Sequence, residues 1–87
     1  MTTKAESVYG EIVRREDVAQ EGVSAVYRLI RRDGGYAVSV ECRGRCEEVA
    51  GFKGGEADAV RLFRLAVDGF VLPGTLADVW HDYHTEG

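Results

Sequence analysis

Apolar and polar positions change their spacing once along this chain, close to Gly54-Gly55. Before this point, apolar residues recur at every second position, which is the period of a strand with one buried face. After it, they recur at every third or fourth position, which is the period of an amphipathic helix. The pattern predicts an α+β domain: an antiparallel sheet of three or four strands, in ββββαα order, with two C-terminal helices packed on one face.

Two runs of alternating residues, 23–32 and 36–42, predict adjacent strands joined at Asp33-Gly34. Aspartate and glycine tolerate the positive φ angles that a two-residue hairpin loop requires. An Asp33-Gly34 loop places Leu29 opposite Val38, so that the apolar side chains of both strands share one face. A Gly34-Gly35 loop would shift the pairing by two residues and keep the same face. A loop with an odd number of residues would place them on opposite faces, which is incompatible with one buried face. The pattern therefore predicts a loop of even length.

The remaining strands are less regular. Residues 8–15 predict a first strand of uncertain facing, and residues 17–22 predict a polar connection that forms a turn or a short helix. After a second reversal at residues 43–45, residues 46–52 predict a last strand, again of uncertain facing. An uncovered edge on either outer strand would allow pairing with a second copy, giving a homodimer, or with a partner protein.

Residues 56–68 have the spacing of a helix, and acidic residues lie near its positive end. Gly69 follows as the predicted left-handed C-cap. A second helix is predicted after Thr75, which would act as the N-cap and form a capping box with Asp78. The helices and the sheet are expected to share one core, made of Tyr27, Leu29, Val38, Val40, Val60, Phe63, Val67, Leu76, Val79 and Trp80.

The length of 87 residues allows one domain, spanning residues 1–87, with residues 1–6 and 85–87 expected to fray. A formal net charge of -4 argues against nucleic acid or an anionic membrane as the main partner, because both attract basic surfaces. No apolar run reaches the roughly 20 residues of a membrane span, and the first residues lack the apolar stretch of a secretory signal. We therefore expect a cytoplasmic protein with no membrane association and with its cysteines as reduced thiols.

Part of the chain resembles a family of small proteins from Gram-positive bacteria and their phages that is classified as a domain of unknown function. The likeness covers about residues 36–83 and lies mainly in the segments 36–40 (YAVSV), 49–52 (VAGF) and 71–83 (VLPGTLADVWHDY). These segments consist of core positions and helix caps. The resemblance implies the α+β fold and a Gram-positive or phage origin, and it implies no activity.

Cys42, Cys46, His81 and His84 are the residue types that hold tetrahedral zinc. The two histidines would share one side of the second helix. However, the gap between the cysteines and the histidines exceeds that of a compact zinc finger, and a chain with its own core does not need a metal ion to fold. The alternative is a buried thiol with surface imidazoles. We expect no metal and no cofactor.

Asp78, His81 and Asp82 form a candidate acid–base group on the second helix. General acid–base catalysis needs a pocket that positions a substrate, and the exposed side of a helix does not provide one. The alternative is an ordinary solvated helix face. We therefore expect no enzymatic activity.

Charged side chains give two candidate surfaces for a protein partner. One is a group of arginines around the central hairpin, which would contact phosphate or an acidic partner: Arg28, Arg31, Arg32, Arg43 and Arg45. Its alternative is a set of charges that protects exposed strands from unwanted pairing. The other surface is acidic, with ordinary solvation as its alternative, and supplies the residues that we predict to contact a partner: Glu47, Glu48, Asp78, His81 and Asp82.

These observations favour a small non-enzymatic protein-binding module, regulatory or inhibitory, with an unknown protein target. An alternative is a phage-type inhibitor, such as an anti-CRISPR protein, whose acidic surface blocks a nucleic-acid-binding channel. Its affinity would fall with added salt. A second alternative is a module stabilised by zinc through Cys42, Cys46, His81 and His84. We do not expect direct binding of nucleic acid.

Overall fold

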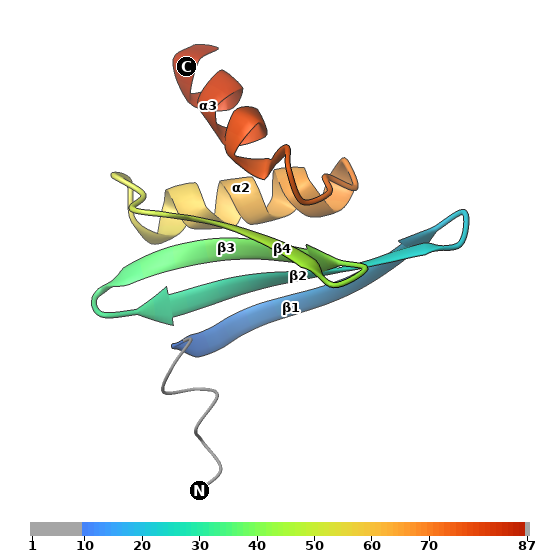
Figure 1. Cartoon of the computed structure of the whole chain (residues 1–87). Coiled ribbons are helices and arrows are strands. Elements are labelled where there is room, and N and C mark those ends of the chain that lie inside the picture. Colours follow the sequence, from blue (N-terminus) through green and yellow to red (C-terminus); the bar gives the residue numbers. More distant parts are fainter. Residues whose placement is uncertain (1–9, 87) are drawn as a thin grey trace, which may run out of the picture.

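The computed structural model describes residues 10–86, with side chains up to residue 82, and shows one sheet covered by two helices (Figure 1). Four antiparallel strands lie in the order β1-β2-β3-β4. The predicted α+β class and ββββαα order are confirmed. The elements are β1 (Glu11–Gln20), β2 (Val23–Arg32), β3 (Gly35–Cys42), β4 (Arg45–Ala50), α2 (Glu56–Asp68) and α3 (Leu76–Glu86).

The predicted fraying of residues 1–6 and 87 lies outside the described residues, and so do Val8 and Tyr9 of the predicted first strand. Residues 85 and 86 form the end of α3. In residues 10–86, neither helix has the length and apolar composition needed to cross a membrane.

Each hairpin turns through two residues, of which the second is glycine. The loops are Glu21-Gly22, Asp33-Gly34 and Arg43-Gly44, and both residues of each loop have positive φ. Positive φ at both positions defines a type I′ turn, whose twist matches that of the flanking strands. The even loop at Asp33-Gly34 places Leu29 opposite Val38, as predicted.

The first strand is longer than the sequence predicts. Residues 17–20, predicted as part of a turn or short helix, continue β1, which pairs with β2 as far as Gln20. The prediction is wrong because β1 lies at the edge of the sheet. Nearly all of its side chains are exposed, so its residues show no alternation of apolar and polar types. A register shift between Ile12 and Arg14 leaves Val13 as an extra residue, which is a β-bulge.

The last strand ends before its predicted limit. β4 covers Arg45–Ala50 rather than residues 46–52. Gly51 has a φ of 78°, which lies outside the β region and takes the chain away from the sheet. The Phe52 ring then meets the edge of Trp80 in α3, with ring centroids 5.2 Å apart. Phe52 therefore joins the end of the sheet to α3.

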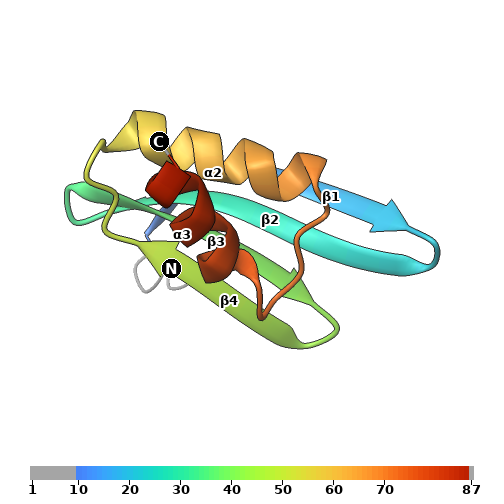
Figure 2. The ribbon, with the colours of Figure 1, turned by 90° about the horizontal axis from the view of Figure 1, so that it is seen from above.

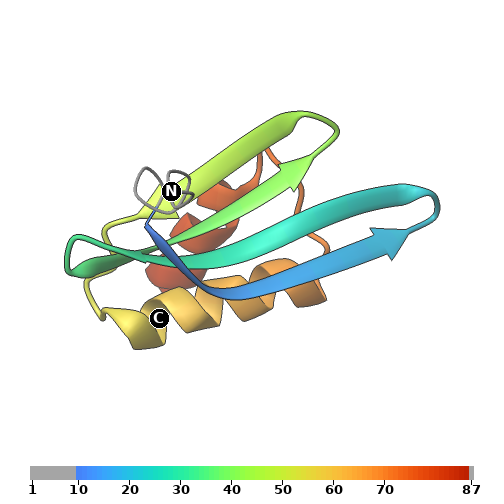
Figure 3. The ribbon, with the colours of Figure 1, turned by 90° about the horizontal axis from the view of Figure 1, so that it is seen from below.

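The core lies between the helices and one face of the sheet, which we call the helix side (Figure 2). The opposite face, called the helix-free face, faces the viewer in Figure 3. Six predicted core residues are buried: Tyr27, Leu29, Val38, Val40, Phe63 and Leu76. Four predicted core residues are only partly buried and pack against its margin: Val60, Val67, Val79 and Trp80.

Helix α2 turns a different face to the sheet than the predicted core residues Val60, Phe63 and Val67 indicate. Ala59, Leu62 and Ala66 have no solvent-exposed surface and join Phe63 in the core, whereas Val60 is only partly buried. These four buried positions have the spacing of one helix face. The two alanines are small enough to let the helix approach the sheet closely, so that Leu62 occupies the middle of the contact.

Helix α2 ends in a Schellman motif in which Phe70, and not Gly69, adopts the left-handed conformation, with a φ of 49°. The amide of Val71 donates to the carbonyl of Ala66 at 2.9 Å, and the amide of Phe70 donates to the carbonyl of Val67 at 3.3 Å. The prediction that Gly69 takes the left-handed position is therefore wrong by one residue. Phe70 also packs against the core, which favours this conformation despite its strain.

The helix-free face carries ion pairs that cross between strands. Arg28 of β2 donates to Glu41 of β3 at 3.1 Å. Arg32 of β2 donates two hydrogen bonds to Glu48 of β4, at 2.7 and 3.1 Å. Three residues of this face are buried near these pairs: Ile30, Ala37 and Ser39. The face therefore combines small or buried residues with a charged, solvated surface.

Leu62→Ala is expected to lower the free energy of unfolding by about 2–5 kcal/mol, because it opens a cavity where α2 meets the sheet. Val60→Ala should cost clearly less, since Val60 already contacts solvent. Urea unfolding followed by the fluorescence of Trp80 measures both values. A larger loss for Val60→Ala than for Leu62→Ala would contradict the orientation of α2.

Candidate protein-binding site

The two cysteines of the candidate zinc site lie on opposite faces of the sheet. Cys42 is buried on the helix side, whereas Cys46 lies opposite Glu41 on the helix-free face and is exposed. Their thiols therefore cannot bind the same metal ion. His81 is exposed on α3, and the side chain of His84 lies outside the described residues. Among the side chains that are described, no group of three or more His, Cys, Asp or Glu residues could hold a metal ion.

The environment of Cys46 favours its neutral form. Partial burial raises the pKa of the Cys46 thiol, and the carboxylate of Glu41 raises this pKa further. The guanidinium of Arg28 acts in the opposite direction but does not outweigh them. Because the thiolate is the nucleophile and the metal ligand, Cys46 is poorly suited to either role.

Glu47, one of the residues predicted to contact a partner, binds the N-terminal end of α3. One carboxylate oxygen accepts hydrogen bonds from the amides of Gly74 and Leu76, both at 2.8 Å, and the other accepts one from Ala77 at 3.0 Å. The first amides of a helix have no partner within the helix, and a negative charge interacts favourably with that end of the helix dipole. Glu47 therefore attaches α3 to β4.

The predicted capping box of Thr75 and Asp78 is replaced by this contact. The Thr75 hydroxyl donates to the carbonyl of Leu72 at 3.0 Å, and the Thr75 amide donates to the same carbonyl at 3.3 Å. In a capping box, that amide would bind the Asp78 carboxylate. The capping carboxylate comes from another element, 29 residues from Leu76 in the sequence, so no local pattern indicates it.

The hydrogen bonds keep Glu47 ionised. Partial burial raises the pKa of this carboxyl group, but the backbone amides of Ala77, Leu76 and Gly74 together lower it more. The pKa of Glu47 therefore lies below the ordinary value for glutamate. The contact between β4 and α3 consequently depends on a charged side chain.

The residues predicted to contact a partner lie on both sides of the sheet. Glu48 lies on the helix-free face, where Arg32 binds it. The remaining three are exposed on α3, across the sheet from Glu48: Asp78, His81 and Asp82. The sheet therefore divides the predicted acidic surface.

The arginines around the central hairpin are also distributed over both faces. Arg28 and Arg32 belong to the ion pairs of the helix-free face, and Arg31 binds Glu11 of β1. The other two lie at the turn between β3 and β4 and are exposed: Arg43 and Arg45. Three arginines of this group are thus partly neutralised by carboxylates, as expected for charges that solvate a sheet face.

Strand β1 offers one open edge of the sheet, and β4 forms the other. In residues 10–86, β1 pairs with β2 alone, so the backbone groups of its outer edge have no strand partner. Helix α2 packs on β2 and β3, and α3 packs on β4. The β1–β2 hairpin continues past the end of α2 (Figure 2). Every residue of β1 except Val18 is exposed.

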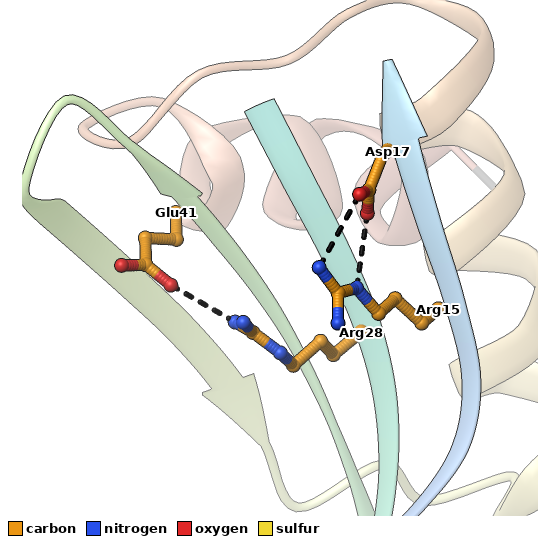
Figure 4. Close-up of polar contacts among 4 residues, drawn as sticks. All are labelled: Arg15, Asp17, Arg28 and Glu41. Atoms are coloured by element: carbon orange, nitrogen blue, oxygen red, sulfur yellow. Dashed lines mark hydrogen bonds and ion pairs between the residues drawn. The ribbon is translucent and has the colours of Figure 1, made fainter. Parts of the chain in front are cut away.

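The side chains of β1 make this edge chemically varied. Ile12 and Val13 are large apolar residues that are 47% and 40% exposed. They are followed by two basic and two acidic residues, at 14–17. The guanidinium of Arg15 donates to both carboxylate oxygens of Asp17, at 3.0 and 3.2 Å (Figure 4). The edge therefore combines an apolar end with a segment that carries both charges, and it is the candidate site for a protein partner.

No family model matches the chain, and comparisons with curated proteins and with solved structures found no match. The resemblance to the Gram-positive family of small proteins stays a prediction. The function is therefore argued from the geometry of the molecule.

Glu47→Gln is expected to lower the free energy of unfolding by about 1–3 kcal/mol, because it removes the charge that the amides of α3 bind. The wild type should lose this contribution as the pH falls from the ordinary pKa of glutamate through the lower pKa that Glu47 has in the folded chain. The variant should lack this part of the pH dependence. Urea unfolding at several pH values between about 7 and 3 measures both effects.

Glu48→Gln is the matched control, because it makes the same change at the next residue on the opposite face. The Glu48 pair with Arg32 is about one-third exposed, with side-chain values of 33% and 30%, so its loss should cost about 0–1 kcal/mol. Equal losses for the two variants, with unchanged pH profiles, would rule out the capping role of Glu47.

Proposed function

We propose that the chain is a small non-enzymatic protein-binding module, regulatory or inhibitory, which binds an extended segment of a protein by adding it as a strand to β1. The observation that carries this proposal is the outer edge of β1, which has no strand partner in residues 10–86. In strand addition, backbone hydrogen bonds give affinity and alternate side chains give specificity.

The chemistry of β1 favours a polypeptide as the ligand. The amides and carbonyls on the outer edge of β1, which belong to alternate residues of the strand, match the spacing of another β-strand. Ile12 and Val13 supply apolar contact at one end, and the charged residues 14–17 favour a strand with complementary charges. The net charge of -4 opposes nucleic acid as the ligand.

The proposal of a non-enzymatic role is supported by the contacts of the candidate reactive groups. Glu47 caps α3 and Glu48 binds Arg32, so these carboxylates have structural partners. Cys46 has a raised pKa, which opposes nucleophilic chemistry. We assign the protein to the cytoplasm, where Cys42 and Cys46 would remain the free thiols that they are in this structure.

Neither alternative function gains support from the described residues. The phage-type inhibitor needs one acidic surface, and the sheet separates Glu48 from the acidic residues of α3. The zinc module needs Cys42 and Cys46 to face one ion, and they lie on opposite faces. The strand-addition module is therefore the function that we carry forward.

Val13→Asp is expected to weaken binding of the protein partner by at least about tenfold, equivalent to 1.4 kcal/mol. It places a charge in the apolar end of the edge without removing a buried side chain. Ala50→Asp is the matched control, because Ala50 is exposed on β4 at the other edge of the sheet. The partner is first captured from host lysate with the tagged wild type, and its affinity for the purified variants is then measured by calorimetry.

Hydrogen–deuterium exchange locates the contact on the backbone. Strand addition should slow the exchange of β1 amides in the complex, because outward-facing amides gain hydrogen bonds. A captured protein that slows exchange only elsewhere, or that binds Val13→Asp and the wild type equally, would refute the proposal. The proposal would also be refuted if the wild type retains no protein that is lost from Val13→Asp.

A further inference from the structure

The charged residues of β1 repeat one pattern on both faces of the strand. Arg14 and Glu16 lie opposite Leu29 and Tyr27 and therefore belong to the helix side, whereas Arg15 and Asp17 belong to the helix-free face. On each face an arginine is followed two residues later by an acid. Because an antiparallel partner runs in the opposite direction, an identical strand would place acids opposite arginines.

We propose that the segment which pairs with β1 is β1 of a second copy of this chain, antiparallel and related by a two-fold axis. This inference rests on the proposed function, since it names the strand that the open edge accepts. In such a pair, one residue lies opposite its own copy, and the residues on either side of it lie opposite each other. The choice of that central residue fixes the register.

A register centred on Glu16 forms two opposite-charge pairs and keeps the bulge out of the ladder. It places Arg15 opposite Asp17 of the second copy twice, on the helix-free face. Glu16 then lies opposite Glu16 of the second copy, a pair of like charges that is offset by Arg14 two residues away on each strand. The paired run extends from Arg14 to Val18 and stays clear of the bulge at Val13.

The neighbouring registers are less favourable. A register centred on Asp17 sets two aspartates directly opposite each other and forms no opposite-charge pair. A register centred on Arg15 pairs Arg14 with Glu16 but sets two arginines opposite each other, and its ladder reaches the bulge at Val13 after Arg14. Each of the three registers sets one pair of like charges opposite each other. The register centred on Glu16 is the one we assign, because it forms two opposite-charge pairs, which the Asp17 register lacks, and it avoids the bulge that the Arg15 register reaches.

The arginines on β1 and β2 add to this preference. Arg15 lies directly opposite Arg28 of β2, which is an unfavourable pairing of like charges. Arg28 reaches away toward Glu41, and Arg15 turns along β1 toward Asp17 (Figure 4). Arg28 and Arg15 therefore lie side by side on neighbouring strands, and Arg15, whose side chain is 55% exposed, is the one at the open edge. Asp17 of the second copy would place a carboxylate on the remaining side of Arg15.

The dimer would form one continuous sheet with the helices of both copies on the same side. Helix α2 packs mainly on β2 and β3, and no described strand pairs with the outer edge of β1. The paired run is short, so the contact belongs with weak interfaces that bury less than about 1,200 Å². We therefore expect a dimer that dissociates on dilution.

Charge-swap variants test the register in solution. Arg15→Asp and Asp17→Arg should each weaken self-association by about tenfold or more, because each sets like charges opposite each other twice. An equimolar mixture of the two variants should associate as the wild type does, since every such pair then joins opposite charges. The double variant R15D/D17R should also recover self-association. Sedimentation equilibrium over a wide range of concentrations measures each constant.

The mixture distinguishes a contact between chains from an effect within one chain. Each variant has the same fold when it is measured alone and when it is measured in the mixture, so only contacts between chains differ. Arg61→Asp is the matched control, since Arg61 is exposed on α2 away from the edge and its reversal should leave the dimer intact. Circular dichroism confirms that every variant is folded before its association is measured.

A wild type that stays monomeric at every concentration would overturn the proposal. So would self-association that survives both single variants, or a mixture no better than its components. A monomeric wild type that still binds another protein, with slowed exchange at β1, would leave the strand-addition function standing and refute only self-pairing. A dimer whose β1 amides exchange as fast as in the monomer would refute self-pairing through β1.

Discussion

Only one face of this sheet is buried under helices, and the arrangement of the molecule follows from that constraint. Alternation places Tyr27, Leu29, Val38 and Val40 on the helix side, so a shift of one residue in any strand would expose them. The same alternation sends neighbouring residues to opposite faces. Cys42 is consequently buried while Cys46 is exposed, and Glu47 reaches α3 while Glu48 binds Arg32.

Two polar contacts from the helix side fix the chain between α2 and α3. The hydroxyl of Tyr27, whose ring is fully buried, donates to the carbonyl of Val71 at 3.0 Å. Glu47 holds the amides at the start of α3. Burial, with a smaller contribution from Cys42, raises the pKa of Tyr27 and keeps its hydroxyl protonated as a donor. The sheet thus supplies the hydrogen-bond partners that an irregular, partly buried connection needs.

The central part of the fold could be predicted from sequence because its signals are local. Alternation and the Asp33-Gly34 loop determine the pairing of β2 with β3, and helical spacing and acidic residues indicate α2 with its correct bounds. The course of β1 could not be predicted, because an edge strand with exposed faces needs no alternation. The predicted face of α2 was wrong. Val60 is more apolar than Ala59, but close approach of the helix to the sheet favours the smaller alanine at the contact.

The candidate site was harder to predict because it depends on contacts that are distant in sequence. Glu47 has the composition of a surface acid, and only the position of α3 shows its capping role. An uncovered edge was predicted at residues 8–15 or 46–52, and in residues 10–86 both β1 and β4 lie at an edge of the sheet, with α3 packed on β4. The charge pattern of residues 14–17 is visible in the sequence. Its meaning requires the facing of β1 and the position of the bulge.

The three two-residue turns have a consequence for how the chain folds. Every strand pairs with its neighbour in sequence, so forming the sheet closes only short loops and carries a small entropic cost. Contacts over long sequence separations arise when the helices dock, as with Tyr27 and Val71, which are 44 residues apart. A topology of this kind has low contact order for a sheet protein and should fold quickly. Its hairpins can form before either helix has covered them.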